Sequence, residues 1–468
     1  RKESMRLCPT QDVIIIQECY NRNMNKKQML RAGMTFLFVT VVGISIVGRT
    51  GRNEPISQPD PSTYEPMKKP ALFSDAYYLV DRDSGQVILE QNSSERIYPA
   101  SMTKMMSVLV ALEAINNPQQ VRIPMDKQML DRLEEENASK AGFDADDEPT
   151  ALDCMYGALL PSGAECTEAL AIYISGSVES FVEKMNAKAA LLGMADTHFT
   201  NTTGLHDDQL YSTCRDMAKL LEAGMQNKIF ADIIKTRFYT STPVKTYPQG
   251  LEMDNNVLQY IDAFEPRYET HFDIPGFIAG KAGYTIEAQY TLASIAQINH
   301  TNLLFVSAHG YKEPHYPASV ADAASVYTWY RDTMSKHAGI RKGESFGVVP
   351  VYDSLKDNVR AIAEDTFTAD LPQGANMHTF RTLMNGIQAP VQKGQIIGHV
   401  DIYAYDQKVG SVNLIAKEDC PKTPAGVALW FLRRHWLPLC LLITVLTALF
   451  FLTQEYARRF YCRGLRRR

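Results

Sequence analysis

Two segments of the chain alternate between apolar and polar residues in the manner of β-strands. Residues 71–92 contain the runs YYLV and VILE on either side of DRDSGQ, which predicts a β-hairpin with a polar turn. Residues 276–309 are again strand-like. Between these segments, apolar residues recur at helical spacing in three stretches, which are residues 101–117, 151–175 and 178–192. This succession of elements predicts a mixed α/β architecture.

The regions on either side of this one have a different composition. Residues 49–68 are rich in proline, serine and other polar residues, which indicates a linker. In residues 343–417, short strand-like runs are separated by turn residues, and this pattern is typical of a β-rich domain. We therefore expect an α/β domain over residues 69–335 and a second, smaller β-rich domain over residues 343–417.

An apolar run without a charged residue lies near each end of the chain. The first, residues 32–48, follows Lys26, Lys27 and Arg31, and a basic segment before an apolar one is typical of an export signal. No A-x-A cleavage site follows it. We expect residues 1–48 to form an N-terminal extension with a signal or anchor segment, in which Met24 is the expected start.

The second run, Trp436 to Gln454, is 19 residues long. As a helix it measures about 28 Å, close to the thickness of a bilayer core. Six arginines follow it, so the positive-inside rule places residues 455–468 in the cytoplasm. The alternative is a buried core helix, which fits poorly with arginine clusters on its flanks. We expect a transmembrane helix over residues 436–454, in the cell membrane.

Composition and charge narrow the class of protein. The chain has 468 residues, of which 45% are hydrophobic and 22% charged, which excludes a disordered chain and favours two domains. The net charge is −5, but the two ends carry +4 and +7, so residues 49–424 carry about −16. An acidic body disfavours nucleic-acid binding. The spacing of Cys and His indicates no zinc site, and we expect no metal and no cofactor.

A serine and a lysine stand three residues apart in the segment YPASMTKMM. Pro99 precedes a helical run, so Ser101 is expected in the first helical turn, with Lys104 on the same face. A lysine made less basic by burial can take the proton of a serine hydroxyl and turn it into a nucleophile. The pair alone is weak evidence, because S-x-x-K occurs by chance roughly once in a chain of this length.

Three further segments strengthen this interpretation. Ser162 lies in GALLPSGAE, where Pro-Ser-Gly predicts a turn that enters a helix, and Lys281 lies in GFIAGKAGYTIEA, where Gly-Lys-Ala-Gly predicts a strand edge. The segment FTNTTGLHDDQLYSTCRDMA stands between them. The segments that contain Ser101, Ser162 and Lys281 resemble, in this order, the S-x-x-K, S-x-N and K-T-G motifs of penicillin-binding proteins and serine β-lactamases. They are most similar to the low-molecular-mass D-alanyl-D-alanine carboxypeptidases. The resemblance covers about residues 67–417, and its β-rich end resembles the C-terminal domain of that family.

The resemblance implies the fold. It is the α/β fold of the serine β-lactamases and penicillin-binding-protein transpeptidases, an antiparallel sheet flanked by helices with a helical subdomain. It also implies the reaction, in which the terminal D-alanine of peptidoglycan stem peptides is removed and β-lactams inhibit covalently. The expected domain lies on the extracytoplasmic side of the membrane.

The resemblance assigns roles to individual residues. Ser101 attacks the peptide carbonyl and Lys104 takes its proton, while Ser162 passes a proton to the leaving amine. The segment Lys281, Ala282, Gly283 and Tyr284 binds the substrate, and Lys281 faces its terminal carboxylate. The backbone amides of Ser101 and Tyr284 form the oxyanion hole.

Two residues depart from the family pattern. The chain has Ala164 where the family has Asn in the second motif, and Ala282 where it has Thr in the third. The resemblance implies that this Asn contacts the substrate and the lysine of the first motif, and that the Thr hydroxyl holds the terminal carboxylate of the substrate. Losing one such hydrogen bond costs about 1–3 kcal/mol, on the order of 10- to 100-fold in rate. Two alternatives therefore stay open: an active or attenuated carboxypeptidase, and a catalytically silent relative that acts as a wall-binding or scaffolding protein. A β-lactamase is disfavoured, because no E-x-x-L-N string lies between Ser162 and Lys281.

Other polar residues receive structural interpretations. His206 is expected to shape a loop, and Arg215 and Asp216 to form a pair at a helix start. Cys154 and Cys166 are expected to be small buried side chains in helices, in preference to a disulfide.

Overall fold

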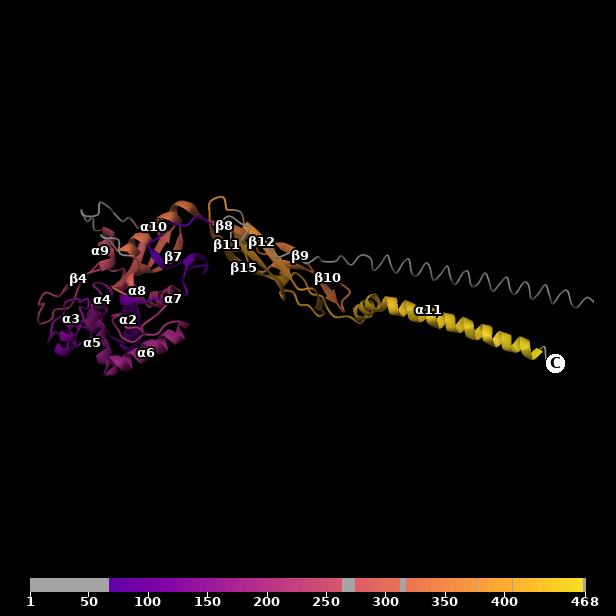
Figure 1. Ribbon diagram of the computed structural model, residues 1–468, viewed down its shortest axis with the longest axis horizontal. Helices are drawn as coiled ribbons and strands as arrows, with labels where there is room; N and C mark the ends of the chain where they lie inside the picture. Colours follow the sequence, from indigo (N-terminus) through magenta and orange to yellow (C-terminus); the bar gives the residue numbers. More distant parts are fainter. Residues whose placement is uncertain (1–66, 263–273, 312–316, 376, 406, 466–468) are drawn as a thin grey trace, which may run out of the picture.

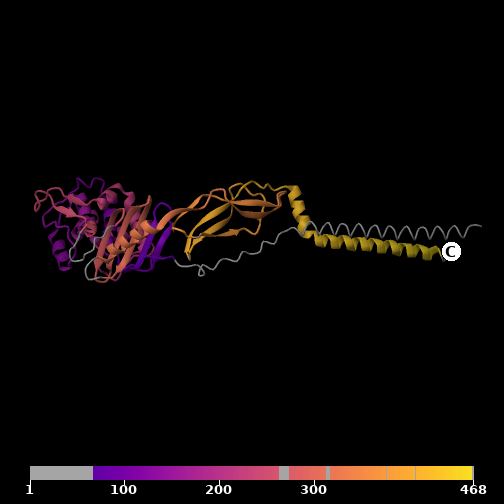
Figure 2. The same cartoon turned by 90° about the horizontal axis from the view of Figure 1, so that it is seen from above.

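The computed structural model describes the whole chain except residues 1–66, 263–273, 312–316, 376, 406 and 466–468 (Figure 1). The expected export segment and nearly all of the expected linker lie outside the described residues. The described chain is elongated: a mixed α/β domain lies at one end, a β-rich domain follows, and the C-terminal helix extends from the other end (Figures 1 and 2).

An antiparallel sheet of five strands forms the centre of the α/β domain. Its strand order is β2-β1-β7-β6-β5, in which β1 and β2 are the hairpin predicted from residues 71–92. The strands predicted from residues 276–309 are β5, β6 and β7. The bounds are β1 Ser74–Asp81, β2 Val87–Gln91, β5 Phe277–Thr285, β6 Gln289–Ile298 and β7 Thr301–Gly310, and a small hairpin adds β3 Phe238–Thr240 and β4 Glu252–Asp254.

Both faces of the sheet are covered, so most residues of β6 and β7 are buried. Along β7, Leu304 and Val306 belong to the core shared with the helical subdomain, whereas Leu303 and Phe305 pack with α10 (Ala318–Thr333) on the opposite face. This alternation follows from the two-residue period of a strand. The sheet is therefore held rigidly between two hydrophobic layers.

The helical subdomain surrounds one helix. Every residue of α2 from Thr103 to Ala111 is buried, so this helix packs against neighbours on all sides. The stretch 151–175, predicted as helical with a Pro-Ser-Gly turn at Ser162, forms two helices that this turn separates. The bounds are α2 Thr103–Ala114, α3 Lys127–Glu135, α4 Ala151–Leu159, α5 Ala164–Ser175, α6 Val178–Leu191, α7 Cys214–Gln226, α8 Lys228–Lys235 and α9 Asn256–Asp262.

The second domain is β-rich. A six-stranded sheet has the order β12-β14-β15-β10-β9-β13, and β8 pairs with β11 in a separate ribbon. The bounds are β8 Met334–Ile340, β9 Ser345–Tyr352, β10 Asn358–Ala363, β11 Phe367–Pro372, β12 Met377–Leu383, β13 Ile387–Gln388, β14 Ile396–Ala404 and β15 Gln407–Ala416.

The C-terminal helix α11 runs from Pro424 to Leu465 and contains Pro438. Among the described residues, no single helix meets the length and hydropathy expected of a membrane span. The segments Pro424–Trp436 and Pro438–Gln454, bent by 70° with respect to one another, meet that test only as a pair. The transmembrane helix expected over residues 436–454 therefore stays a prediction.

A buried polar cluster joins the two domains. The Gln86 side chain, next to the turn of the β1–β2 hairpin, donates to the Asp370 carbonyl at 2.9 Å and accepts from the Asp370 amide at 2.7 Å. The Asp370 carboxyl is buried and faces Asp81 and the Tyr330 hydroxyl. Lys336 Nζ lies 3.8 Å from the Asp81 carboxylate. Burial, reinforced by Asp81, raises the pKa of Asp370 from 3.8 to about 6.

This carboxyl makes the stability of the chain depend on pH. Because its pKa is higher in the folded state, the folded chain holds the proton more tightly, and stability falls as the pH rises from about 4 to about 6. In D370N the side-chain amide donates as the protonated acid does and never ionises. We expect D370N to be more stable than the wild type by about 1–2 kcal/mol at pH 7.5, and equally stable at pH 4.

Thermal unfolding of the full chain at the two pH values measures this difference. The control is D365N, because Asp365 is an exposed carboxylate paired with Lys342 in the same domain and should leave both midpoints unchanged. A D370N midpoint at pH 7.5 that equals or lies below that of the wild type would contradict the prediction.

Candidate active site

Ser101 and Lys104 meet at the start of the buried helix α2. Ser101 lies in the short 3₁₀ turn Ala100–Met102 that leads into α2, rather than in the α-helix itself. Lys104 Nζ donates to Ser101 Oγ at 2.8 Å and to the Thr203 carbonyl at 2.8 Å. The lysine side chain is only 2% exposed. The sequence spacing therefore brings the amine and the hydroxyl into hydrogen-bond contact.

Burial changes the protonation of this lysine. It lowers the pKa of Lys104 from 10.5 to about 7, while the neighbouring Glu165 carboxyl and Cys166 thiol act in the opposite direction. A substantial fraction of Lys104 is thus the free amine near neutral pH. A free amine at hydrogen-bond distance from a hydroxyl has the position and the basicity of a general base.

Ser162 and Lys281 form a second pair of the same kind. Lys281 Nζ, on β5, donates to Ser162 Oγ at 2.9 Å and to the Ala282 carbonyl at 2.9 Å. Both side chains are buried. Burial lowers the pKa of Lys281 well below its ordinary value, and the Lys104 cation lowers it further. The two buried lysines are therefore close enough to influence each other.

Strand β5 passes directly beside the Ser101 backbone. A Cβ atom at Gly283 would lie 2.6 Å from the Ser101 amide nitrogen, so only glycine permits this approach. Tyr284, the next residue, is half-exposed, and its ring centroid lies 4.8 Å from that of Tyr290 on β6. The predicted residues Ser101, Lys104, Ser162, Lys281 and Gly283 thus come together from three separate segments.

Backbone strain accompanies both serines. Ala100, immediately before Ser101, has φ of 48°, and Ser162 itself has φ of 72°, a left-handed conformation that residues other than glycine rarely adopt. Gly204 packs onto this corner, because a Cβ there would lie 1.8 Å from the Ala100 carbonyl oxygen. Strained residues of this kind persist where the surroundings hold them, and they cluster at functional sites.

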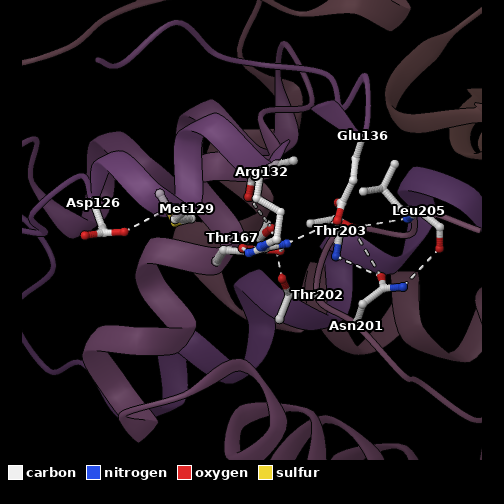
Figure 3. A network of polar contacts seen from close by, with 11 residues as sticks. Asp126, Met129, Arg132, Glu136, Thr167, Asn201, Thr202, Thr203 and Leu205 are labelled. Carbon is white, nitrogen blue, oxygen red and sulfur yellow. Dashed lines mark hydrogen bonds and ion pairs between the residues drawn. The ribbon is translucent and has the colours of Figure 1, made fainter. Parts of the chain in front are cut away.

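The acceptor for Lys104 is held by a turn that sequence reasoning missed. Asn201 Oδ1 accepts from the amides of Thr203 and Gly204 at 3.2 and 2.7 Å, and Asn201 Nδ2 donates to the Leu205 carbonyl at 3.0 Å (Figure 3). This Asx-type turn orients the Thr203 carbonyl toward Lys104. The only signal in the sequence was the position of Asn201 within FTNTTGLHDDQ.

The two departures from the family pattern are found at the site. Ala164 is the first residue of α5 and is 1% exposed, and Ala282 is half-buried beside Lys281 on β5. Neither side chain offers a polar group. Glu165, which follows Ala164, is fully buried and was not anticipated from the sequence.

The remaining expectations concern residues around the site. His206 lies 3.3 Å from Asp208 and 3.9 Å from Glu287, and its ring meets Tyr98 edge-on, so it joins a loop to the β5–β6 turn. Asp216 accepts from the amide of Asp196 and lies in the first turn of α7. Cys154 and Cys166 are free, buried thiols, as their spacing predicted. Within the described residues, no cluster of three or more His, Cys, Asp or Glu side chains forms a metal site.

Comparison with known proteins agrees with this geometry. Relatives include the D-alanyl-D-alanine carboxypeptidases DacF of Bacillus subtilis, 28% identical over 74% of this chain and 85% of its own, and DacA of Haemophilus influenzae, 28% identical over 77% and 88%. The crystal structure of penicillin-binding protein 5 from Haemophilus influenzae superposes with a TM-score of 0.57 at 25% identity. It covers 76% of this chain and all of that one.

Family models match both domains. Residues 335–422 match the C-terminal domain of penicillin-binding protein 5. Residues 63–309, more than half of the chain, match the D-alanyl-D-alanine carboxypeptidase model, and the chain therefore belongs to the Peptidase S11 family of D-alanyl-D-alanine carboxypeptidases.

Proposed function

We propose that this protein is a serine-type D-Ala-D-Ala carboxypeptidase that removes the terminal D-alanine from peptidoglycan stem peptides and binds penicillin. One observation carries the proposal. A buried lysine amine with a pKa of about 7 lies 2.8 Å from the hydroxyl of Ser101. The family of the chain and the names of its relatives supply the substrate class.

The reaction follows from the two serine–lysine pairs. Ser101 Oγ attacks the carbonyl carbon between the two D-alanines, while its proton passes to Lys104. The C–N bond then breaks, and Ser162 relays the proton taken up by Lys104 to the leaving amine, so that D-alanine departs, Lys104 is again the free amine and an ester remains on Ser101. Water hydrolyses this ester and regenerates the hydroxyl. A β-lactam acylates Ser101 by the same attack on its ring amide.

The substrate is held by charge and by backbone amides. The terminal carboxylate faces Lys281, and an incoming anion favours the charged form of that lysine against the effect of burial. The developing oxyanion is assigned to the amides of Ser101 and Tyr284. The close passage of Gly283 beside the Ser101 amide supports this assignment.

A catalytically silent wall-binding protein was the alternative suggested by Ala164 and Ala282. The comparisons give it no support, because the relatives of this chain are named as D-alanyl-D-alanine carboxypeptidases. The buried Ser101–Lys104 and Ser162–Lys281 pairs also favour turnover.

The role of Ser101 predicts the loss of two signals together. The wild-type protein should be labelled by a fluorescent penicillin and should release D-alanine from a D-Ala-D-Ala-terminated peptide, and Ser101→Ala should abolish both. The control Ser107→Ala removes a buried hydroxyl two turns further along, which donates to the Thr202 carbonyl, and should keep both signals. Labelling of the wild type without D-alanine release would identify the silent relative. The absence of both signals in the wild type would refute catalysis.

The role of Lys104 predicts a pH dependence. Because the base is the free amine, the acylation rate should rise with pH and reach half its plateau near pH 7. Lys104→Arg keeps a cation that cannot be deprotonated, and should lower the acylation rate by at least ~100-fold at every pH between 6 and 9. Penicillin acylation rates across this range measure both effects. A rate independent of pH, or an active arginine variant, would contradict the assignment.

We further propose that α11 anchors the protein in the cell membrane, with the catalytic domain outside and the arginine-rich end in the cytoplasm. The observation behind this is a run of exposed apolar side chains in the second half of α11, from Leu441 to Leu452, with arginines beyond it. Exposed apolar surface of this extent calls for a lipid or protein partner.

Reporter fusions test this topology. Alkaline phosphatase fused after residue 422 should be active, because this reporter functions only outside the cytoplasm, and the same fusion after residue 468 should be inactive. Green fluorescent protein at the two positions should give the reverse result. Phosphatase activity at both positions would mean that α11 does not cross the membrane.

A further inference from the structure

The Thr203–Gly204 peptide group lies between the catalytic lysine and the side chain of Asn201. Its carbonyl oxygen accepts from Lys104 Nζ at 2.8 Å, and its N–H group donates to Asn201 Oδ1 at 2.7 Å. The peptide bond is trans, so its C=O and N–H bonds lie in one plane and point in opposite directions. Holding the Gly204 N–H group on Asn201 therefore directs the Thr203 carbonyl toward Lys104.

The Asn201 side chain closes the turn around this peptide group (Figure 3). Its Oδ1 also accepts from the Thr203 amide at 3.2 Å and from the Thr203 hydroxyl at 3.3 Å, while its Nδ2 donates to the Leu205 carbonyl at 3.0 Å. The Thr203 hydroxyl in turn accepts from the Leu205 amide at 3.1 Å. Thr203 and Gly204 are buried, whereas Asn201 is half-buried. One amide side chain thus fixes the conformation of the whole turn.

The same turn touches the backbone of the nucleophile. Gly204 has φ of 82°, and a Cβ there would lie 1.8 Å from the Ala100 carbonyl oxygen and 3.0 Å from the Ser101 amide nitrogen. Ala100 is itself strained, with φ of 48°. The amide of the Ala100–Ser101 peptide is the one assigned to the oxyanion hole. The turn therefore borders both the base and the backbone that receives the developing negative charge.

The chain that leads into the turn is held independently of Asn201. Asn186 on α6 accepts from the Phe199 amide and donates to the Phe199 carbonyl, both at 2.8 Å. Thr202 Oγ1 donates to Thr167 Oγ1 on α5 at 3.3 Å. Loss of the Asn201 side chain therefore frees the Thr203–Gly204 peptide group without releasing the segment from the helices.

We propose that Asn201 is a positioning residue of the active site, which holds the Thr203–Gly204 peptide group so that its carbonyl directs the Lys104 amine toward Ser101. This inference rests on the proposed function, because it assigns Lys104 as the base. The free amine has two hydrogens and one lone pair. When the Thr203 carbonyl accepts one of these hydrogens, rotation of the amine is restricted and its lone pair stays available to the Ser101 hydroxyl. Without the carbonyl, the amine would present its lone pair to Ser101 for only part of the time.

The same carbonyl affects the charge of Lys104. A carbonyl oxygen that accepts from an ammonium group favours the charged form of that group. The titratable groups that face Lys104 are Glu165 and the Cys166 thiol on α5 and Lys281 on β5. A substitution at position 201 leaves all three in place. A change in the protonation of Lys104 in such a variant therefore comes from the turn.

The test removes the Asn201 side chain and measures two quantities. The rate of acylation of Asn201→Ala by a fluorescent penicillin is measured on the full chain in detergent micelles from pH 5 to 9. The plateau rate should fall by about 100-fold, since a misplacement of about 1 Å costs that much. The pH at which the rate reaches half its plateau, near 7 in the wild type, should fall by about 1 unit, because the ammonium form loses an acceptor.

Two matched variants show whether these changes come from the turn. Asn201→Asp keeps an oxygen that accepts from the Thr203 and Gly204 amides and loses only the donor to the Leu205 carbonyl. Its plateau should stay within about 10-fold of the wild type, and its half-plateau pH should equal or exceed that of the wild type, since a carboxylate favours the ammonium form. Asn186→Ala removes two hydrogen bonds to Phe199 in the same segment. Its plateau and its half-plateau pH should match those of the wild type.

The outcomes decide the inference. An unchanged half-plateau pH in Asn201→Ala would overturn it, because a merely structural asparagine affects stability and leaves the pH dependence in place. The same falls in Asn186→Ala would also overturn it, because any loosening of the segment would then suffice. If Asn201→Ala does not unfold cooperatively, Asn201→Asp decides, and a half-plateau pH below that of the wild type overturns the inference. A wild type that neither acylates nor releases D-alanine would instead refute the proposed function, so the two failures are distinct.

Discussion

The burial of two lysines beside two serine hydroxyls is the interaction on which the rest of the site depends. An ammonium group removed from water loses several kcal/mol of hydration unless dipoles or opposite charges replace the water. Lys104 and Lys281 each receive one serine hydroxyl and one backbone carbonyl. These contacts are too few for two permanent charges, so the pKa of both lysines is lowered. The same deficit that opposes burial supplies a base near neutral pH.

The fold buries both lysines and places backbone carbonyls beside them. Helix α2 is enclosed on all sides, which places its first turn in the interior of the domain. The sheet lies between two hydrophobic cores, which hold β5 so that Gly283 stays directly beside the Ser101 amide. Between them, the Asn201 turn presents the Thr203 carbonyl. The two serine–lysine pairs are thus held by helices on one side and by the sheet on the other, and the positive φ values of Ala100 and Ser162 mark where the chain is constrained.

Much of the fold and of the site could be predicted from the sequence, because these parts follow local patterns. Ser101, Lys104, Ser162 and Lys281 lie in short motifs with a local pattern, and the hairpin at residues 71–92 has the two-residue period of a strand. The remainder depends on contacts between distant segments. The Pro-Ser-Gly turn indicated the break at Ser162 within residues 151–175, but not the contacts of residues 139–142 that hold this turn. Nor could the raised pKa of the Asp370 carboxyl be foreseen, since its neighbours Asp81 and Tyr330 come from the other domain.

Ala164 is a departure from the family pattern that affects both substrate binding and the protonation of Lys104. The resemblance places an Asn there that contacts the lysine of the first motif. An acceptor oxygen at that place would stabilise the ammonium form of Lys104, so its absence favours the free amine. The alanine therefore removes one contact with the substrate, but it leaves a larger fraction of Lys104 as the free amine at neutral pH. Glu165, the next residue of the same helix, acts in the opposite direction, because it raises the pKa of Lys104 against the effect of burial. The two positions therefore act on one lysine in opposite directions, and a substitution at either one has to be judged by the pH at which the acylation rate reaches half its plateau as well as by the rate at a single pH.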